Sequence, residues 1–589
     1  MTSRRDFLKI FGGSLTASLL AGGLHCRHSA RRPNVVLIIT DDQGWGDLHI
    51  HGNPQIDTPV LDKLSTESVR FERFFVSPVC APTRASLLTG RDHLRTGTVW
   101  VTHRLETMRS NEVTLAEVLK QAGYATGCFG KWHNGAYYPH HPNAKGFDEF
   151  LGFCAGHWNN YFDTTLERNS KPIKTAGYIT DVLTDAALEF INQYKNHPFF
   201  CYVPYNAPHG PFQVPDRYFE KYKQRGLNDK DACVYGMVEN LDENIGRILQ
   251  RLDQLNLTQD TIMIFLTDNG PNGQRFNGGM RGVKGSVHEG GIRVHCFIRW
   301  PGHLTAGLNI PQIAAHIDLL PTIVELCDLP PPETLPLDGV SLVPLLTSQF
   351  SEWPERMLFT HHSRRGQVEL GPASVRTQRY RLVTDGTHWE LYDLEIDPAE
   401  TQNIASQQPE ITRKLRAAYE TWFEEVIQNG FEPAPIPVGY PQANPVELLA
   451  PDAHLNGNLA FKGKTGWAND WITNWTNTTD FVTWDIEVIK AGSYEISLLY
   501  TCPESSVGSR VRIEMADASS EAVITEPHDP SPIPSPDRVP RGEVYEKVWK
   551  SLSMGTLSLK PGKTHLKLRA LSIPGPTAME LKGVRVKKL

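Results

Sequence analysis

"PNVVLIIT" (Pro33–Thr40) is a continuous run of apolar, β-forming residues that ends in a polar side chain. This pattern is typical of a strand that is buried on both faces of a sheet. Similar runs recur at His197–Tyr205 and Asp260–Gly270, with helical patterns between them at Thr114–Tyr124 and Gly236–Leu255. Strands that alternate with helices predict a large α/β domain on a mixed, mainly parallel sheet flanked by helices.

The chain divides into units that differ in their pattern of predicted strands and helices. The α/β pattern occupies residues 32–348, and shorter strands followed by a helix predict a smaller α+β subdomain over 349–430. The proline-rich segment 431–446 is typical of a connector. Alternating strands then predict a terminal β-sandwich over 447–589.

Residues 1–31 resemble a bacterial twin-arginine export signal. Arg4 and Arg5 precede the apolar stretch Ile10–Leu24, which is short for a membrane span and ends in small residues. We expect an exported chain, periplasmic or extracellular, with no transmembrane segment in its mature form. A histidine precedes Cys26 where a lipoprotein signal has a small residue, so lipid anchoring is not predicted. An amphipathic first helix is the alternative.

Composition excludes several function classes. The chain of 589 residues has 59 Lys and Arg against 66 Asp and Glu, a net charge of −7, and no strongly basic block. Nucleic acid is therefore not an expected partner. Nine cysteines without a C-x-x-C pair indicate neither a disulfide scaffold nor a thiolate zinc site.

One cysteine stands in an unusual local sequence, "SPVCAPTRASLLTGR". Pro82 suits the first turn of a short helix and Gly90 suits its end, which places Cys80 at the helix N-terminus. Unpaired N–H groups and the helix dipole favour a negatively charged neighbour at that place. A buried structural thiol is the alternative interpretation.

Oxygen-bearing side chains follow two of the predicted buried strands. Asp41 and Asp42 come directly after the first strand, and Asp268 and Asn269 come after a later one. Since strand ends of a parallel sheet gather at one edge, four such side chains suit calcium or magnesium better than zinc. Each pair alone would read as ordinary turn residues.

Basic and imidazole side chains complete the candidate site. Arg84, Lys131 and Lys284 could together hold a tetrahedral oxyanion, and His133 and His209 have the chemistry to move protons near neutrality. Taken singly, each histidine is more often structural and each lysine more often solvated. Their combination with the carboxylates favours a catalytic interpretation.

These motifs together resemble a type I sulfatase of the alkaline-phosphatase-like superfamily over about residues 32–427. The shared motifs, in the family's order, are "GDL", "GNPQIDTPVLDKLSTESVRF", C-x-P-x-R with "ASLLTGR", "GKWH", "APH", "TDNG", the Lys284 stretch and "LYDLEIDPAETQNIA". The resemblance implies that Cys80 is oxidised to formylglycine (3-oxoalanine) by a formylglycine-generating enzyme before folding, and that the aldehyde is hydrated.

The resemblance also implies roles for the other residues. Ca²⁺, or Mg²⁺ in its place, would be held by Asp41, Asp42, Asp268, Asn269 and residue 80. One hydroxyl of residue 80 would attack sulfur, and the second would allow C–O cleavage that expels sulfate. Arg84 would stabilise the hydrate, Lys131 and Lys284 would bind sulfate, His209 would protonate the departing sugar oxygen, and His133 would take a proton from the second hydroxyl.

Residues between the shared motifs are candidates for substrate binding, because aromatic rings, amides and imidazoles suit sugar rings and hydroxyls. These candidates are Trp100, His103, Tyr137, His141, His157, Trp158, Asn159 and Asn160. Plain packing is the alternative for each aromatic residue. The resemblance favours a carbohydrate sulfate ester as substrate, with exo action on galactose or N-acetylgalactosamine sulfates of a glycan or polysaccharide.

The predicted sandwich contains a tryptophan-rich stretch that includes Trp467, Trp471, Trp475 and Trp484. It resembles carbohydrate-binding appendages, although tryptophans of a small sandwich are more often part of its core. Two rival functions stay open: a phosphodiesterase or phosphonate monoester hydrolase of the same superfamily, and a non-catalytic sugar-binding protein. No oligomeric state follows from the sequence.

Overall fold

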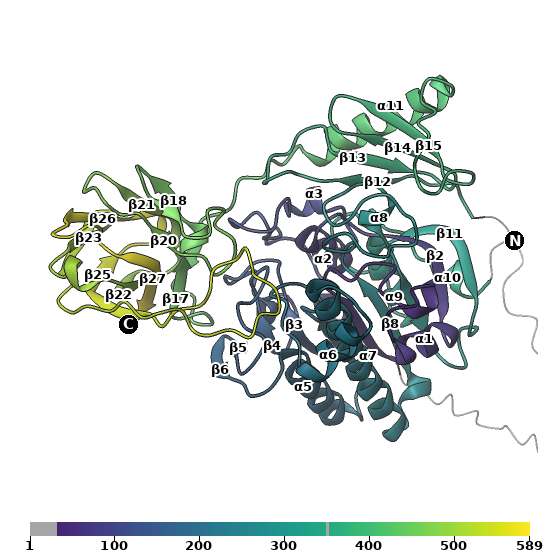
Figure 1. Cartoon of the computed structure of the whole chain (residues 1–589), viewed down its shortest axis with the longest axis horizontal. Helices are drawn as coiled ribbons and strands as arrows, with labels where there is room; N and C mark the ends of the chain where they lie inside the picture. The colour runs from purple at the N-terminus through teal and green to yellow at the C-terminus, as the bar shows by residue number, and fades with distance from the viewer. Residues whose placement is uncertain (1–31, 349–352) are drawn as a thin grey trace, which may run out of the picture.

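The computed structural model describes residues 32–348 and 353–589, and its largest unit is an α/β domain on a mixed eleven-stranded sheet (Figure 1). The strands lie in the order β11 (Asn309–Ala315), β2 (Val69–Phe75), β10 (Cys296–Arg299), β8 (Thr261–Thr267), β1 (Asn34–Thr40), β7 (Phe199–Pro204), β3 (Ala125–Lys131), β4 (Glu149–Phe153), β5 (Thr165–Arg168) and β6 (Lys171–Lys174), while β9 (Arg293–Val294) pairs with β2. The central strands β8, β1, β7, β3 and β4 are parallel, and antiparallel pairs occur toward the edges. The predicted fold class is confirmed.

Helices cover both faces of this sheet, because successive residues of β1 point to opposite sides. Val36 and Ile38 pack in the core beneath α1 (Pro59–Thr66), α5 (Ile179–Tyr194), α6 (Asp216–Gln224) and α7 (Asp229–Gln254). Val35, Leu37 and Ile39 pack on the other face with α2 (Cys80–Thr89), α4 (Leu115–Gln121), α9 (Leu319–Leu326) and α10 (Val343–Leu346). All seven residues of β1 are buried, which explains the unbroken apolar run in the sequence.

A smaller unit follows the α/β domain. Its antiparallel sheet consists of β12 (Leu358–His361), β13 (Ala373–Arg376), β14 (Tyr380–Thr384) and β15 (Trp389–Asp393). Helix α11 (Pro409–Val426) packs on this sheet through Leu415, Tyr419 and Phe423. Two short helices, α3 (His93–Thr96) and α8 (Glu289–Ile292), lie on the side of the α/β domain that faces this unit (Figure 1).

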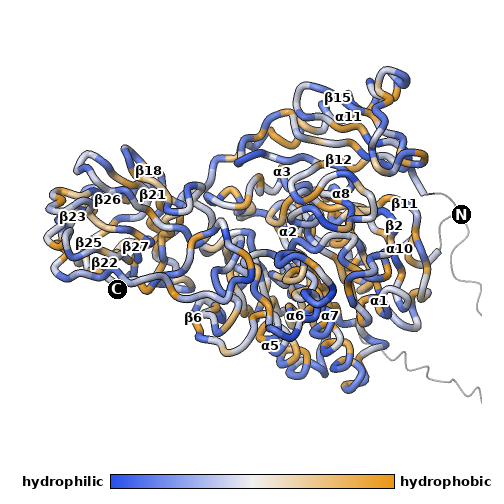
Figure 2. Tube along the Cα trace, viewed as in Figure 1, coloured by the Kyte–Doolittle hydropathy of each residue, from blue (hydrophilic) through white to orange (hydrophobic). Residues whose placement is uncertain are grey.

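The chain ends in two six-stranded sheets that enclose one apolar core, in which Trp475 and Trp484 are fully buried. One sheet contains β16 (Ile436–Val438), β18 (His454–Asn456), β21 (Phe481–Val488), β23 (Arg510–Met515), β24 (Ala518–Val523) and β26 (Gly562–Ser572). The other contains β17 (Val446–Leu449), β19 (Ala460–Phe461), β20 (Ile472–Thr473), β22 (Gly492–Thr501), β25 (Lys550–Leu559) and β27 (Glu580–Lys588). Figure 2 shows apolar residues running through these strands and hydrophilic ones in the outer loops.

The sandwich begins earlier in the chain than the sequence predicts. Strand β16 lies inside the segment 431–446, which is predicted as a connector, and pairs in parallel with β21. Pro437 occupies the middle of this short strand at the end of the sheet path, a position where a missing N–H group is tolerated. Proline content alone therefore concealed a strand.

The predicted export segment and Cys26 lie outside the described residues. Within residues 32–348 and 353–589, no helix combines the length and the apolar character needed to cross a membrane. The eight cysteines of this part of the chain are all buried and free.

The terminal sandwich contacts the α/β domain through polar and apolar groups. Tyr137 packs against the sandwich core, and its hydroxyl donates a 2.5 Å hydrogen bond to Asp452 Oδ2. Arg104 donates to the carbonyl of Ala434. Glu106 lies beside Asp452 in this interface, and its Oε2 atom is buried without a hydrogen-bonding partner among the described residues.

We expect Glu106 to make stability pH-dependent, because burial and the nearby Asp452 raise its pKa to about 7. The folded chain keeps the proton at Glu106 over a range in which the unfolded chain has lost it, so this contribution to stability declines as the pH rises from about 4.5 through 7. Glu106→Gln stays neutral, and its melting temperature should fall less than that of the wild type between pH 5 and pH 8. An unchanged slope in Glu106→Gln would contradict this, and Glu67→Gln, at a surface carboxylate, is the control.

Candidate active site

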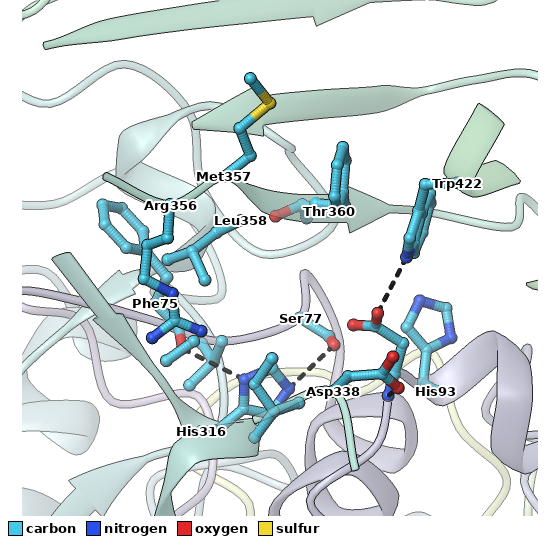
Figure 3. Close-up of a pocket in the computed structure, with 15 residues that line it drawn as sticks. Phe75, Ser77, His93, His316, Asp338, Arg356, Met357, Leu358, Thr360 and Trp422 are labelled. Atoms are coloured by element: carbon cyan, nitrogen blue, oxygen red, sulfur yellow. Dashed lines mark hydrogen bonds between the residues drawn. The ribbon is translucent and has the colours of Figure 1, made fainter. Parts of the chain in front are cut away.

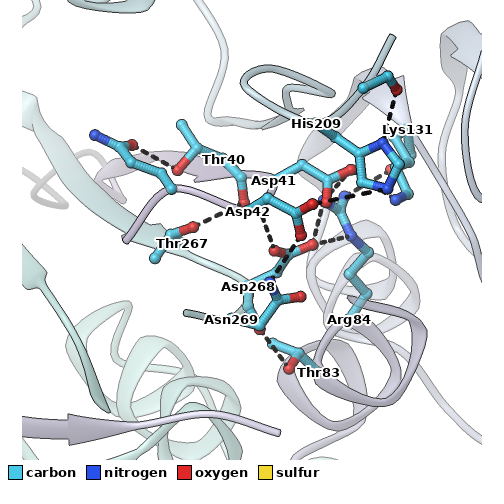
Figure 4. Close-up of polar contacts among 12 residues, drawn as sticks. Thr40, Asp41, Asp42, Thr83, Arg84, Lys131, His209, Thr267, Asp268 and Asn269 are labelled. Atoms are coloured by element: carbon cyan, nitrogen blue, oxygen red, sulfur yellow. Dashed lines mark hydrogen bonds and ion pairs between the residues drawn. The ribbon is translucent and has the colours of Figure 1, made fainter. Parts of the chain in front are cut away.

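The ends of strands β1 and β8 bring the predicted carboxylates together (Figure 4). The two strands pair in register, with Thr40 opposite Thr267, so the residues that follow them become neighbours. The N–H of Asp42 donates to Asp268 Oδ1 at 3.1 Å, and Asn269 Nδ2 donates to Asp42 Oδ1 at 2.8 Å. All four predicted oxygen ligands are at most 1% exposed.

Three basic side chains pair with these carboxylates. Lys131, the last residue of β3, donates to Asp41 Oδ2 at 2.6 Å, and Lys284 Nζ lies 2.5 Å from Asp42 Oδ1. Arg84 on α2 donates from Nε and Nη2 to Asp268 Oδ2 at 3.1 and 2.8 Å. Buried charges are stable only when they are paired in this way.

Burial and charge act in opposite directions on the acidic groups. Burial alone would raise the pKa of Asp41, but nearby positive charges, Lys131 above all, hold that pKa far below its ordinary value. Burial and repulsion from Asp41 instead raise the pKa of Asp268 to about 7. Asp268 is therefore the carboxylate of the three that binds a proton most readily, even though Arg84 pairs with it.

Cys80 opens helix α2, and its side chain is 3% exposed. Its sulfur lies within 4.8 Å of carboxylate oxygens of Asp41 and Asp268. Burial raises the pKa of the Cys80 thiol, so the unmodified side chain is neutral and a poor nucleophile. Helix α2 ends at Gly90, whose φ of 68° is the left-handed cap that the sequence indicated.

Some buried polar atoms of the site have no hydrogen-bonding partner within the described part of the chain. Asp41 Oδ1, Asp42 Oδ2 and Asn269 Oδ1 share this property. Unsatisfied buried oxygens are costly, and an all-oxygen set of carboxylates and an amide is what calcium or magnesium prefers. The residues present therefore fit a divalent cation.

The two predicted histidines have different surroundings beside this group. His209 Nδ1 is 2.7 Å from the carbonyl of Gly210, and its Nε2 is 3.8 Å from Asp42 Oδ2. His133 Nε2 is 2.9 Å from the carbonyl of Val101, while its buried Nδ1 has no partner in the described part of the chain. Burial, aided by the charge of Lys131, lowers the pKa of His133 well below its ordinary value and keeps the ring neutral.

Of the predicted substrate-binding residues, His157 and Asn159 lie close to the site. The ring of His157 is parallel to that of His209, and the two ring centroids are 6.5 Å apart. Burial is the main cause that lowers the pKa of His157, and the positive charge of His209 lowers it further. Asn159 Oδ1 is buried, and the side chain of Asn159 hydrogen-bonds to His157. Asn160 instead accepts from the N–H of Phe162, two residues along the same segment.

The other predicted substrate-binding residues are engaged in structural contacts. Tyr137 and His103 hold the sandwich: His103 Nδ1 is 2.6 Å from the carbonyl of Pro451. His141 Nε2 lies 2.6 Å from Glu167 Oε1, and Trp158 donates to Thr164 Oγ1. The remaining one, Trp100, packs near the ring of His362 at 5.8 Å.

Sequence reasoning missed several residues that shape the site. Thr83 Oγ1 donates to the carbonyl of Asp268 at 2.7 Å and thereby ties α2 to the end of β8. Arg275 Nη2 donates to the carbonyl of Asp42. Tyr161 donates its hydroxyl to the carbonyls of His209 and Gly210 at 2.9 Å. Thr83 lies inside the C-x-P-x-R motif, and Tyr161 directly follows the candidate Asn160. Their closeness in sequence to predicted site residues was the signal that could have identified them.

A cavity of about 120 Å³ lies elsewhere, between the α/β domain and the small antiparallel sheet (Figure 3). Its lining includes Asp92, which accepts from Trp422 Nε1 at 2.9 Å, and His316, which contacts Ser77 Oγ at 3.3 Å. Lining residues of this cavity do not include the grouped carboxylates or Cys80. The candidate active site is therefore the carboxylate group at the ends of β1 and β8.

Comparisons with known proteins agree with this geometry. The family model described as Sulfatase matches residues 33–329, and the one described as N-sulphoglucosamine sulphohydrolase, C-terminal, matches residues 283–425. Human N-acetylgalactosamine-6-sulfatase is 32% identical over 65% of this chain and 78% of its own length. Human arylsulfatase A is 32% identical over 67% of this chain and 88% of its own.

Solved structures with a similar fold include the following two. Ps i-CgsB in complex with k-i-k-neocarrahexaose has a TM-score of 0.64 at 29% identity and covers 69% of this chain and 95% of its own. A phosphonate monoester hydrolase of Agrobacterium radiobacter, at 22% identity and a TM-score of 0.51, shares the fold, covering 68% and 96%. With the family matched over the whole α/β domain and its characteristic motifs gathered at one sheet edge, this chain belongs to the sulfatases, the enzymes that hydrolyse sulfuric esters.

Proposed function

We propose that this protein hydrolyses sulfate monoesters on carbohydrates with residue 80 as formylglycine and with Ca²⁺ held by Asp41, Asp42, Asp268 and Asn269. The observation that carries the proposal is the set of unpartnered oxygens beside Cys80 at the N-terminus of α2. When bound, the cation would draw charge from a sulfate oxygen. The hydrated aldehyde would supply an oxygen nucleophile, whereas a neutral thiol is a poor nucleophile.

The basic side chains would hold the substrate's sulfate group. Lys131 and Lys284 now pair with Asp41 and Asp42. A cation that takes those carboxylate oxygens would leave the ammonium groups to donate to sulfate oxygens. Arg84 is anchored on Asp268 and on the carbonyl of Lys131, so it would keep a fixed positive charge beside residue 80.

The histidines would move the protons. His209 is 13% exposed on its side chain and Lys284 is 19% exposed, whereas Lys131 and Arg84 are fully buried. Access from solvent therefore lies on the His209 side, where a departing sugar oxygen would receive its proton. The ring of His133 is neutral, and its unpartnered Nδ1 atom can accept a proton.

The relatives support a sugar as the alcohol part of the ester. N-acetylgalactosamine-6-sulfatase names such a substrate, and Ps i-CgsB was solved with a neocarrahexaose. We propose galactose or N-acetylgalactosamine sulfates, attacked at a chain end, as the substrates of this chain. The proposed export of the protein to the periplasm or beyond would bring it to such glycans.

Replacing the modified side chain should abolish the reaction. Cys80→Ala removes the nucleophile, and we expect sulfate release to fall by at least about 10³-fold. Mass spectrometry of the tryptic peptide Phe74–Arg84 from wild-type protein, coexpressed with a formylglycine-generating enzyme, should show the loss of sulfur from residue 80. An intact thiol in a fully active sample would contradict the proposal, and thermal unfolding of the variant checks its fold.

Removing calcium should lower both activity and stability. A ligand bound at 100 times its Kd stabilises the folded state by about 2.7 kcal/mol, so chelation should lower the melting temperature measurably. Asp42→Asn should lose calcium binding in calorimetry, whereas Asp57→Asn, at a surface carboxylate paired with Lys221, should retain it. A chelated wild type with undiminished activity and melting temperature would refute the metal site.

The loss of activity on replacing His209 should depend on the leaving group of the substrate. A sugar alkoxide needs a proton to depart and a nitrophenolate does not, so His209→Ala should lose about 10²–10⁴-fold on sugar sulfates and far less on nitrophenyl sulfate. Equal losses on both substrates would exclude a role as general acid. His454→Gln, at an exposed histidine of the sandwich, is the control.

The rival functions make different predictions for the same assays. A phosphodiesterase or phosphonate hydrolase should turn over aryl phosphate esters at rates comparable to aryl sulfate. A sugar-binding protein should bind sulfated sugars and release no sulfate. Paired carboxylates with one amide, rather than a histidine-rich set, favour the sulfatase reaction in this chain.

A further inference from the structure

The terminal sandwich reaches the candidate active site through two of its loops. We call residues 463–470 the tryptophan loop and residues 529–549 the arm. Figure 1 shows the arm, in yellow, leaving the sandwich and crossing to the α/β domain beside β3 and β4. Neither loop lies within the residues that the family models match, which end at residue 425.

The tryptophan loop contacts segments next to both proposed catalytic histidines. Thr102 Oγ1 donates to the carbonyl of Gly466 at 3.1 Å, and the neighbouring Val101 carbonyl contacts His133. Asn469 Nδ2 donates to the carbonyl of His157 at 3.1 Å. Because the ring of His157 lies 6.5 Å from that of His209, the loop contacts segments adjacent to both histidines.

The arm holds the segment that carries Asn159. Arg541 Nη1 donates to the Asn159 carbonyl at 2.7 Å, and Asn159 Nδ2 donates to Glu546 Oε2 at 2.9 Å. Arg541 also pairs with Asp537 at 2.6 Å, and these two side chains are only 2% and 8% exposed. This pair orders the arm itself, and the hydrogen bonds to Asn159 join the arm to the α/β domain, so it is not a tethered, independent module.

A chain of hydrogen bonds continues from the arm to His209. Gln213 Nε2 donates to Asp537 Oδ1 at 2.7 Å, and Gln213 Oε1 accepts from the N–H of Tyr161 at 2.8 Å. Tyr161 in turn donates to the carbonyl of His209. The arm is therefore linked through Gln213 and Tyr161 to the backbone of the proposed general acid.

Both loops present an aromatic ring to solvent. Trp467 is 40% exposed, whereas Trp471, Trp475 and Trp484 are at most 2% exposed. Tyr545 is 38% exposed, and its ring lies under the guanidinium of Arg541 at 4.5 Å. An exposed aromatic ring offers a flat apolar face on which a sugar ring can stack.

The two loops meet at the segment that carries His157 and Asn159. The side chain of Asn159 hydrogen-bonds to His157, and Asn159 Oδ1 and His157 Nε2 have no other hydrogen-bonding partner in the described part of the chain. The hydroxyl groups of a sugar both donate and accept, so they match this pair of side chains. Exposed rings together with such polar side chains are typical of a carbohydrate-binding surface.

We propose that the terminal sandwich builds a subsite for the sugar chain attached to the sulfated residue. Trp467 and Tyr545 stack on its rings, and His157 and Asn159 bind its hydroxyls. The sandwich is thus a part of the active site, and it makes the enzyme prefer an oligosaccharide to a single sugar. This subsite rests on the proposed sulfatase function for its position next to His209.

The test compares substrates of different length. From a panel of galactose and N-acetylgalactosamine sulfates, the one that the wild type hydrolyses fastest is assayed free and at the end of a tetrasaccharide, beside nitrophenyl sulfate. Trp467→Ala and Tyr545→Ala should each lower kcat/KM for the tetrasaccharide about two- to tenfold, the range of one aromatic contact. Both should keep the wild-type rate, within about twofold, on the free sugar and on nitrophenyl sulfate.

Matched variants separate binding from folding. Trp467→Phe and Tyr545→Phe keep a ring and should restore most of the tetrasaccharide rate. Tyr380→Ala removes a ring that also packs on an arginine, Arg379, far from the sandwich, and should change nothing. Equal losses on all three substrates, or none on the tetrasaccharide, would overturn the subsite while leaving the sulfatase reaction intact.

Calorimetry with the desulfated tetrasaccharide tests the subsite apart from catalysis. Binding to wild-type protein that both alanine variants weaken supports the proposal, and binding that survives in both overturns it. Absence of sulfate release from every substrate in the wild type would instead refute the proposed function, so the two failures are distinguishable.

Discussion

The structure depends on keeping three carboxylates buried at the shared edge of β1 and β8. Asp41, Asp42 and Asp268 carry three negative charges, and Arg84, Lys131 and Lys284 carry three positive ones at contact distance. This balance is uneven, since the pKa of Asp41 is held low while that of Asp268 is raised to about 7. A divalent cation would add two positive charges, take carboxylate oxygens from the two lysines, and give the site a net positive charge that an anionic sulfate ester could neutralise.

Helix α2 is placed by this arrangement as much as by its own sequence. Its hydrophobic residues Leu87 and Leu88 pack under the sheet, and Thr83 and Arg84 bind the end of β8. With ten buried residues, α2 has little freedom to move Cys80 away from the carboxylates. The C-x-P-x-R spacing suits this geometry, because Pro82 is tolerated in the first turn of the helix and Arg84, one turn after Cys80, reaches the carboxylate of Asp268.

The sequence predicts the α/β fold well, because a strand buried on both faces must be apolar at every position, as β1 is. It also indicates which polar residues gather at one edge, since that follows from parallel pairing. Tyr137 and His103 show the limit: aromatic and imidazole side chains have the same appearance in a sugar site and in a domain interface. Strand β16 was hidden by prolines that its place in the sheet tolerates. The catalytic roles stay predictions, because a list of residues does not say which proton moves.

The contacts at the interface hold the sandwich in one orientation relative to the α/β domain. A carbohydrate-binding module on a linker raises only the local concentration of substrate, and it needs no particular orientation. Here Tyr137, His103 and Arg541 each make a hydrogen bond between the sandwich and the α/β domain, so the loops of the sandwich keep one position relative to His209. Ordering a loop costs conformational entropy, and buried ion pairs and hydrogen bonds are the usual means of offsetting that cost. Loops that are ordered before the ligand binds can orient the sugar as well as bind it. Orientation matters because proton transfer from His209 requires the sugar oxygen within hydrogen-bonding distance.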